Sequence, residues 1–245
     1  MIARIHVAAL AVICVSSCIV GCKAQPAKPA GFVDDSTMTK DPSLPFHKVW
    51  FKPGFEFASY KQIYVAPVNT SYMLKMTDWQ KGERKDEIEK DTAKLGLFSQ
   101  EAIKKAFRDD PAHRFTVVES PTADGKTLIF EFALVEVVPS KVVLNALGFA
   151  PYFVGLGLSV FRAAGHDVSS AAFEARIRDA GTNLVVAMLA DREQEQTAAV
   201  SVRGLTWYSH AETIVRQWSS QFVRLANRKP GEQIRDTDPF TLQPW

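Results

Sequence analysis

The sequence predicts one α+β domain in which helices pack on one face of a largely antiparallel sheet. Three observations carry this prediction. Runs of β-branched and aromatic residues recur along the chain, two long segments repeat apolar residues at helical spacing, and residues 169–193 hold two strand patterns joined by a tight turn. Apolar residues make up 47% and charged residues 23% of the 245 residues, a composition that indicates a folded chain with a full core.

The first half of the predicted domain runs strand, helix, strand, strand. Residues 61–68, KQIYVAPV, are rich in β-branched and aromatic residues and end near a proline, which is typical of a strand. In residues 83–108 apolar side chains recur at helical spacing among Glu, Lys and Asp, and an Asp-Asp-Pro sequence then ends the helix. Residues 114–120 and 127–138 are the next two strands.

The second half begins with a β-hairpin and ends with a helix. Residues 169–179 alternate, which places Glu174, Arg176 and Arg178 on one face and apolar side chains on the other. We favour a solvent-facing side of the sheet over a polar groove for this charged face. The turn DAGTN then leads into a strand over 184–193. An apolar stripe over 211–225 predicts the last helix, with Ser209 and Glu212 as a candidate capping box.

The N-terminus predicts an export signal. A weakly basic start precedes residues 7–20, an uncharged apolar run that has the length of a signal-peptide core and is short for a spanning helix. The sequence IVGC at 19–22 resembles the bacterial lipobox, in which a small residue precedes the cysteine that is acylated, with palmitate among its chains. We therefore expect residues 1–21 to be a lipoprotein signal peptide and Cys22 to be the lipidation site.

Cys18 is an alternative acylation site, and the residue after Cys22 indicates in which membrane the protein is anchored. The sequence before Cys18 is also lipobox-like, but we favour Cys22 because the apolar run continues through Val20 and charge begins only at Lys23. In Gram-negative lipoproteins an Asp at this next position signals inner-membrane retention. Its absence predicts an anchor at the periplasmic face of the outer membrane.

The three cysteines, Cys14, Cys18 and Cys22, all lie in this N-terminal region. Cleavage before Cys22 would remove two of them and acylation would consume the third. The mature domain would then contain no disulfide, no thiolate nucleophile and no cysteine metal site.

The rest of the chain divides into three parts. Residues 22–58 hold several prolines and predict a tether after the acylated cysteine, although the aromatic residues in its later half indicate partial order against the domain. Residues 59–228 are the predicted periplasmic domain. Residues 229–245 form a polar, proline-containing C-terminal tail.

One segment inside the domain, residues 142–161, is uncharged for twenty residues. Its glycines, proline and asparagine weaken the case for a spanning helix without closing it. A packed helix–turn insert and an exposed apolar surface for a membrane or partner stay open beside it. The side chains that would make such a contact are Leu147, Phe149, Tyr152, Phe153, Leu156 and Leu158.

The sequence contains no strong catalytic or metal-binding motif. No two of the five histidines have metal-ligand spacing, and no phosphate-binding loop or nucleophile elbow occurs, so we expect no metal, no cofactor and no enzymatic activity. A weaker alternative is an envelope hydrolase that uses His166 and Asp167 with Ser169 or Ser170. The formal net charge of +2 gives no reason to expect a nucleic-acid partner.

Three stretches, 31–41, 50–68 and 173–192, read GFVDDSTMTKD, WFKPGFEFASYKQIYVAPV and FEARIRDAGTNLVVAMLADR. Together with the lipobox they resemble the bacterial lipoprotein family called domain of unknown function 3313, although Val33 and Ser36 replace the Leu and Tyr usual in its opening motif. The resemblance implies an envelope lipoprotein and brings no catalytic residues.

These observations favour an acyl-anchored envelope lipoprotein that acts as a non-enzymatic protein-binding or assembly module. Its expected partners are the membrane, through the acyl chains, and a protein partner or a second copy of the chain. The alternative is a subunit of a membrane-associated assembly or channel that inserts residues 142–161.

Overall fold

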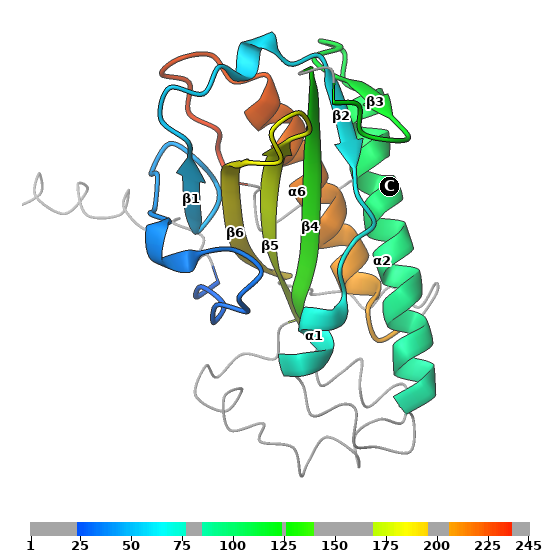
Figure 1. The fold of residues 1–245 in the computed structure, drawn as a ribbon. Coiled ribbons are helices and arrows are strands. Elements are labelled where there is room, and N and C mark those ends of the chain that lie inside the picture. The colour runs from blue at the N-terminus through cyan, green and yellow to red at the C-terminus, as the bar shows by residue number, and fades with distance from the viewer. Residues whose placement is uncertain (1–23, 77–84, 124–125, 140–168, 196–205, 237–245) are drawn as a thin grey trace, which may run out of the picture.

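The structure, a computed structural model, describes residues 24–76, 85–123, 126–139, 169–195 and 206–236. Within these ranges six strands form one open sheet in the order β1-β6-β5-β4-β2-β3 (Figure 1). The strands are β1 (Lys48–Phe51), β2 (Gln62–Val65), β3 (Thr116–Val118), β4 (Thr127–Val138), β5 (Ser169–Asp179) and β6 (Val185–Glu195). The helices are α1 (Ser71–Met76), α2 (Lys85–Arg108) and α6 (Ser209–Ala226), with the short 3₁₀ turns η1 (Asp35–Thr37) and η2 (Phe57–Ser59).

The sheet is mixed, with antiparallel pairing along most of its width. β1, β6, β5 and β4 pair antiparallel in that order, while β2 lies parallel to both β4 and β3. The β2–β3 pair is parallel because α1 and α2 connect the two strands, and such a helical crossover returns the chain to the same end of the sheet. The predicted α+β fold with a largely antiparallel sheet is confirmed.

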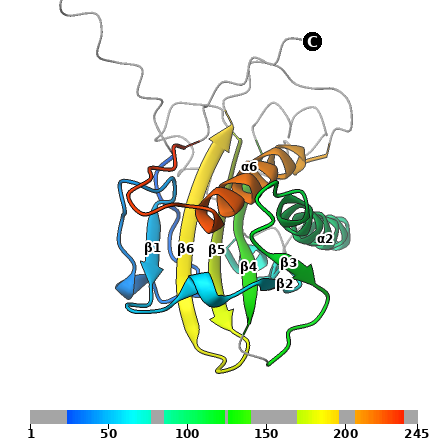
Figure 2. The same ribbon diagram turned by 90° about the horizontal axis from the view of Figure 1, so that it is seen from above.

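Two helices cover one face of this sheet. α2 and α6 pack against each other and against the strands behind them (Figure 2). The core between the layers is aromatic, and the Trp218 ring of α6 lies 4.7 Å from the Phe173 ring of β5 in an edge-to-face arrangement. Phe222, one helical turn further on, lies 5.0 Å from Phe130 and 5.3 Å from Phe173. Burial of side chains of this size is the main source of stability for this face.

The opposite face is covered by the N-terminal segment, for whose first half the sequence predicts a tether. Ala24 is 4% exposed, and Phe32, Val33 and Met38 pack on Ala133, Val135, Ala172 and Met188 of the sheet in a second apolar cluster. We call residues 24–46 the N-terminal strap. The strap therefore packs on the domain from Ala24 onward, whereas the sequence predicts a tether over residues 22–58 with partial order only in its later half.

Glu174 explains why the strap docks. Its carboxylate accepts hydrogen bonds from the backbone N–H groups of Ala30, Phe32 and Val33 at 2.6, 2.7 and 3.1 Å. Glu174 is 3% exposed, so the preference for a solvent-facing charged side is wrong at this residue. The alternation of 169–179 identifies the face correctly but does not show what covers it.

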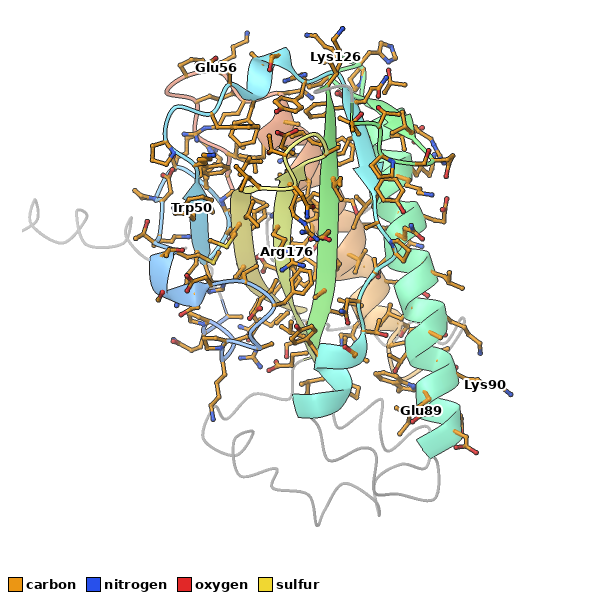
Figure 3. The ribbon with its side chains drawn as sticks, in the orientation of Figure 1. Trp50, Glu56, Glu89, Lys90, Lys126 and Arg176 are labelled. Atoms are coloured by element: carbon orange, nitrogen blue, oxygen red, sulfur yellow. The ribbon has the colours of Figure 1, made fainter. Side chains whose placement is uncertain are left out.

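The two arginines of the same face lie beside the strap. Arg176, which is labelled over the centre of the sheet in Figure 3, bonds to Glu131 on β4, as Arg178 does. Arg176 also donates to the carbonyl of Phe32. Burial acts to raise the pKa of Glu131, but the hydrogen bonds and charges of the two arginines outweigh it and hold that pKa below its usual value.

Several helix and strand details differ from the sequence prediction. β1 and α1 are not predicted as elements, and α1 lies at the end of β4. α6 begins at Ser209 with Tyr208 at the cap position, where no side chain caps the helix, so the capping box is wrong. Instead Trp207, just before the helix, donates to the Asp91 carboxylate of α2 at 3.1 Å and fixes the start of α6.

Some predictions fall outside the described residues. They concern the signal peptide 1–21, Cys22, the insert 142–161 with its six apolar contact residues, and the tail beyond Asp236. Within the ranges that the structure does describe, none of the helices combines the length and the apolar character that crossing a bilayer requires.

Candidate functional site

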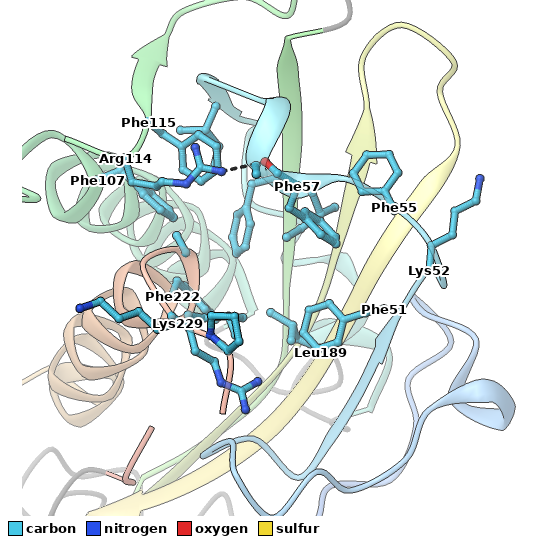
Figure 4. Close-up of a pocket in the computed structure, with 18 of the residues that line it drawn as sticks. Phe51, Lys52, Phe55, Phe57, Phe107, Arg114, Phe115, Leu189, Phe222 and Lys229 are labelled. Carbon is cyan, nitrogen blue, oxygen red and sulfur yellow. Dashed lines mark hydrogen bonds between the residues drawn. The ribbon is translucent and has the colours of Figure 1, made fainter. Parts of the chain in front are cut away.

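A pocket of about 600 Å³ opens at one end of the domain, between the sheet and the C-terminal ends of α2 and α6 (Figure 4). Small-molecule sites commonly have volumes of about 300–1,000 Å³. Seven phenylalanines from five separate parts of the chain line it: Phe51, Phe55, Phe57, Phe107, Phe115, Phe130 and Phe222. The wall is therefore predominantly apolar.

One wall comes from the connection between β1 and β2. Gly54 has a φ of +70°, a value that favours glycine, and turns the chain so that Phe51, Phe55 and Phe57 come together. The Phe55 and Phe57 rings lie 4.7 Å apart, and Phe51 lies 6.2 Å from Phe57. The aromatic density of residues 46–57 is thus used to build a pocket wall.

The facing wall comes from the two long helices and the segment after α2. Phe107, near the end of α2, lies 6.1 Å from Phe115, and Phe222 on α6 contacts Phe130 of β4. After α6 the chain turns at Gly231, whose φ is +78°, and residues 228–231 close this side. Arg108 and Ala226 end the two helices close to the pocket.

Four cationic side chains line the same pocket: Lys52, Arg114, Arg228 and Lys229. Arg114 donates to the carbonyl oxygens of Tyr60 and Phe57, both at 2.7 Å, and its guanidinium carbon lies 4.3 Å from the Phe115 ring centre. Burial lowers the pKa of Arg114 from its ordinary value, which is so high that the group stays charged at neutral pH. None of the described lining residues is acidic.

A buried polar cluster lies toward the other end of the sheet. Asp191 of β6 is 3% exposed and accepts from the backbone N–H of His47 at 3.0 Å and from the Trp218 indole at 3.0 Å. The His47 ring lies 2.6 Å from Asp191 through Nδ1 and 2.7 Å from the carbonyl oxygen of Ala24 through Nε2. Both ring nitrogens are engaged, and the cavity beside them, about 20 Å³, has room for about one water molecule. This cluster holds the strap in place and offers no substrate space.

The serines of the hydrolase alternative lie at the same end. Ser169 and Ser170 begin β5 and are buried, while His166 and Asp167 fall outside the described residues. The Ser170 hydroxyl accepts from Arg192 at 3.1 Å and lies 3.4 Å from a Glu136 carboxylate oxygen, to which it donates. Its surroundings are those of a structural ion pair, because Arg192 also bonds to Glu136 at 2.8 Å.

His210 is the most strongly perturbed titratable group near these serines. It is 6% exposed, its Nε2 lies 3.3 Å from the Ser170 carbonyl oxygen, and its Nδ1 has no partner among the described residues. Burial lowers the pKa of His210 from 6.5 to about 4, against the smaller opposing effect of the Ser170 carbonyl. The imidazole is therefore neutral at pH 7.

Metal binding finds no support in the part of the chain that the structure describes. There, no three side chains of the types His, Cys, Asp and Glu gather closely enough to hold an ion.

Sequence reasoning missed the pocket, although one signal was visible. The aromatic residues of 46–57 indicated packing against the domain, but their partners lie in 107–115 and 222–231. No local pattern connects three segments so far apart along the chain. The cations are equally hidden, because single Lys and Arg residues in turns are ordinary surface features.

Comparison with known proteins gives a family and little more. No curated protein matches the chain. Two solved structures, a PelC dodecamer and a single-substitution variant of the PelC dodecamer, both from Paraburkholderia phytofirmans, align with TM-scores of 0.38 and 0.37 at 10% sequence identity. Each alignment covers 71% of this chain and 95% or 96% of the other. A similarity this low supports no conclusion about the role or the assembly of this chain. The family model for “Protein of unknown function (DUF3313)” matches residues 28–222, and the chain therefore belongs to that family.

Proposed function

We propose that the chain is a non-enzymatic envelope lipoprotein whose domain binds an apolar ligand in the phenylalanine-lined pocket. The observation that carries this proposal is the pocket itself, which is about 600 Å³ in volume and is lined mainly by apolar side chains, with four cations as its only polar side chains among the described lining residues. Side chains that filled this space would raise the stability of the domain, since buried apolar surface stabilises a fold and cavities cost free energy. Ligand binding gives the space a role.

Anchoring through acylated Cys22, at the periplasmic face of the outer membrane, is the second part of the proposal. It rests on the signal and lipobox patterns of the sequence. Ala24 is already packed on the domain, so only Lys23 separates it from the proposed acylated residue. The anchor would then hold one end of the domain directly at the bilayer rather than at the end of a long tether.

The residues that flank the apolar insert lie at the same end of the sheet as Ala24. Val138 at the end of β4 pairs with Ser170, and Ser169 pairs with Glu195, so the residues that flank 140–168 lie at the end of the sheet where Asp191 and His47 hold Ala24. In a protein anchored through Cys22, an insert that leaves the sheet at this end would start close to the membrane. This favours membrane or partner contact by 142–161, from Leu147 to Leu158, over a role far from the bilayer.

Membrane fractionation tests the anchor. Replacing Cys22 with alanine is expected to move the protein from the membrane fraction to the soluble fraction, because two or more acyl chains anchor stably and their loss leaves none. Cys18→Ala is the matched control and should leave the protein on the membrane. A Cys22→Ala protein that stays membrane-bound until residues 145–159 are also deleted would assign the attachment to the insert, and one that stays bound even then would contradict the anchor proposal.

Binding of an uncharged fluorescent probe, N-phenyl-1-naphthylamine, tests the pocket. We expect saturable binding to the Cys22→Ala protein and a loss of at least tenfold in affinity for Ala226→Phe. Ala226 lines the pocket, so the added ring occupies part of its volume. Ala93→Phe, on the exposed face of α2, is the matched control and should bind as the parent does. If Ala226→Phe and Ala93→Phe bind the probe equally well, the probe does not bind in this pocket and the proposed binding site is wrong.

A further inference from the structure

If the pocket binds a ligand, as proposed above, the residues of its wall restrict the chemistry of that ligand. The inference in this section rests on that proposed function. Of the described lining residues, only Lys52, Arg114, Arg228 and Lys229 carry polar side chains, and all four are cations. Ligand hydroxyl, ester or amide groups along the apolar wall would have no side-chain partner, and buried polar groups without partners are costly. The wall therefore favours a ligand that is hydrocarbon except for one anionic group.

Arg114 is the cation that reaches furthest among the phenylalanines. In Figure 4 its side chain extends from beside Phe115 toward Phe57, whereas the ammonium groups of Lys52 and Lys229 point to the outer margin. Two of its N–H groups bond the carbonyls of Phe57 and Tyr60. A guanidinium has five donors, so three remain, and its planar fork matches a carboxylate.

The lining of the pocket itself carries positive charge, because four of the described lining residues are cations and none is acidic. The side chains of Lys52, Arg114 and Lys229 form no ion pair with a described carboxylate. Two carboxylates lie nearby and accept from backbone N–H groups instead, Asp110 from Arg114 at 3.1 Å and Glu232 from Lys229 at 2.9 Å. Arg228 is the most engaged of the four, because it donates to the Glu232 carbonyl and the Ser43 hydroxyl and its charge acts on Asp41. The mouth of an apolar pocket is thus left with an excess of positive charge, which complements an anion.

We propose that the pocket binds a long-chain fatty carboxylate, with the chain among the phenylalanines and the carboxylate at Arg114, supported by Lys229 and Lys52. A pocket of about 600 Å³ suits one chain. A diacyl lipid brings a second chain and ester oxygens, which the apolar wall does not satisfy. The mouth lies at the opposite end of β4 from Val138, so in the anchored protein this ligand arrives from the periplasmic side.

Displacement of the naphthylamine probe from the Cys22→Ala protein by amphiphiles, each below its micelle concentration, tests this assignment. Affinity should rise roughly fourfold for each methylene between decanoate and tetradecanoate, as burial of CH₂ groups predicts. Dodecanoate should bind at least tenfold more tightly than dodecyltrimethylammonium or dodecanol. Equal affinities for the anion and the cation would overturn the proposal. A twelve-carbon lysophosphatidylglycerol that binds more tightly than dodecanoate would also overturn it, in favour of a glycerophosphate lipid.

Two changes to the chain locate the carboxylate. Arg114→Gln removes the charge but keeps an amide that can bond a carbonyl, and it should weaken dodecanoate at least tenfold while leaving dodecanol unchanged. Lys105→Gln, an exposed cation of α2 outside the pocket, is the matched control and should change neither affinity. Dodecanoate binding that appears only after residues 237–245 are removed would assign the pocket to the chain's own C-terminal segment and overturn the proposal. The amphiphile series needs no pocket variant, so it decides the matter even if Arg114→Gln does not fold.

The probe and the amphiphiles together separate the carboxylate assignment from the binding of apolar ligands in general. If the neutral probe binds and Ala226→Phe blocks it, but anionic and cationic amphiphiles compete equally, the binding function stands and the carboxylate assignment falls. If the probe does not bind at all, the binding function itself falls.

Discussion

Replacing Glu174 with alanine is expected to lower the free energy of unfolding by about 3 kcal/mol or more. Three backbone N–H groups of the strap, those of Ala30, Phe32 and Val33, lose their acceptor, and each buried donor left without a partner costs about 1–3 kcal/mol. The methyl group of alanine cannot reach them. Water that enters to satisfy them would have to separate the strap from the sheet, which exposes the second apolar cluster as well.

Urea unfolding and amide hydrogen exchange together measure this effect. The urea midpoint should fall, and exchange protection should be lost first at Phe32 and Val33, before the strands of the main core. Glu174→Gln keeps one acceptor oxygen but turns an amide NH₂ toward the remaining donors, so an intermediate loss is expected. An unchanged midpoint in Glu174→Ala, with protection kept at these amides, would contradict the role assigned to this carboxylate.

A second carboxylate shows that burial, not charge alone, makes Glu174 important. Glu119 pairs with Lys104 and Arg108 on the surface, and the hydrogen bond and charge of Lys104, helped by Arg108, lower the pKa of Glu119. Surface ion pairs contribute little because solvent screens them. Glu119→Ala is therefore the matched control, and its effect should be much smaller than that of Glu174→Ala.

The elements predicted most accurately are those whose patterns are local. β4 and β5 have the bounds that residue alternation and β-branched runs predict, and α2 begins within two residues of its predicted start. In each case neighbouring residues along the chain share one environment, so composition over ten residues is enough. Helical spacing likewise identifies α6, although it does not identify the residue at which the helix begins.

The strap and the pocket could not be predicted in the same way. The strap depends on hydrogen bonds between Glu174 and residues more than 140 positions earlier, and its proline content resembles that of a linker. Glu174 looks like any charged residue on an alternating strand. The pocket requires the β1–β2 connection, the end of α2 and the end of α6 to meet, and only the completed sheet places them together. The sequence thus predicted the framework and not the surfaces assembled from distant segments.

The second large effect is a loss of stability in mild acid that His210 causes. Burial holds the pKa of His210 at about 4 in the folded protein, below its ordinary value of 6.5. Between these two pH values the unfolded chain binds more protons than the folded one. Stability therefore falls as pH falls from 6.5 to 4, and the full difference corresponds to about 3 kcal/mol.

The pH range in which His210 lowers stability is separate from the range in which the buried carboxylates do so. Burial acts to raise the pKa of Asp110 and of Asp179, but hydrogen bonds, chiefly from Asn227 to the first and from Thr182 to the second, outweigh it and lower both. A carboxylate whose pKa is lowered contributes stability that is lost only as pH falls toward and through that lowered value. Their contribution is thus lost below the range in which His210 takes up its proton.

Urea unfolding at pH 7 and pH 5 checks the prediction. The wild-type protein should lose about 2 kcal/mol between the two, because at pH 5 most of the unfolded chains but few folded ones carry the proton. His210→Gln cannot titrate, so its stability should change little over this interval, whatever its stability at pH 7. His113→Asn is the matched control: His113 is exposed with a φ of +47°, which asparagine tolerates, and this variant should keep the wild-type pH dependence. If His210→Gln loses as much stability as the wild-type protein between pH 7 and pH 5, the acid sensitivity lies elsewhere and the buried neutral imidazole is not its cause.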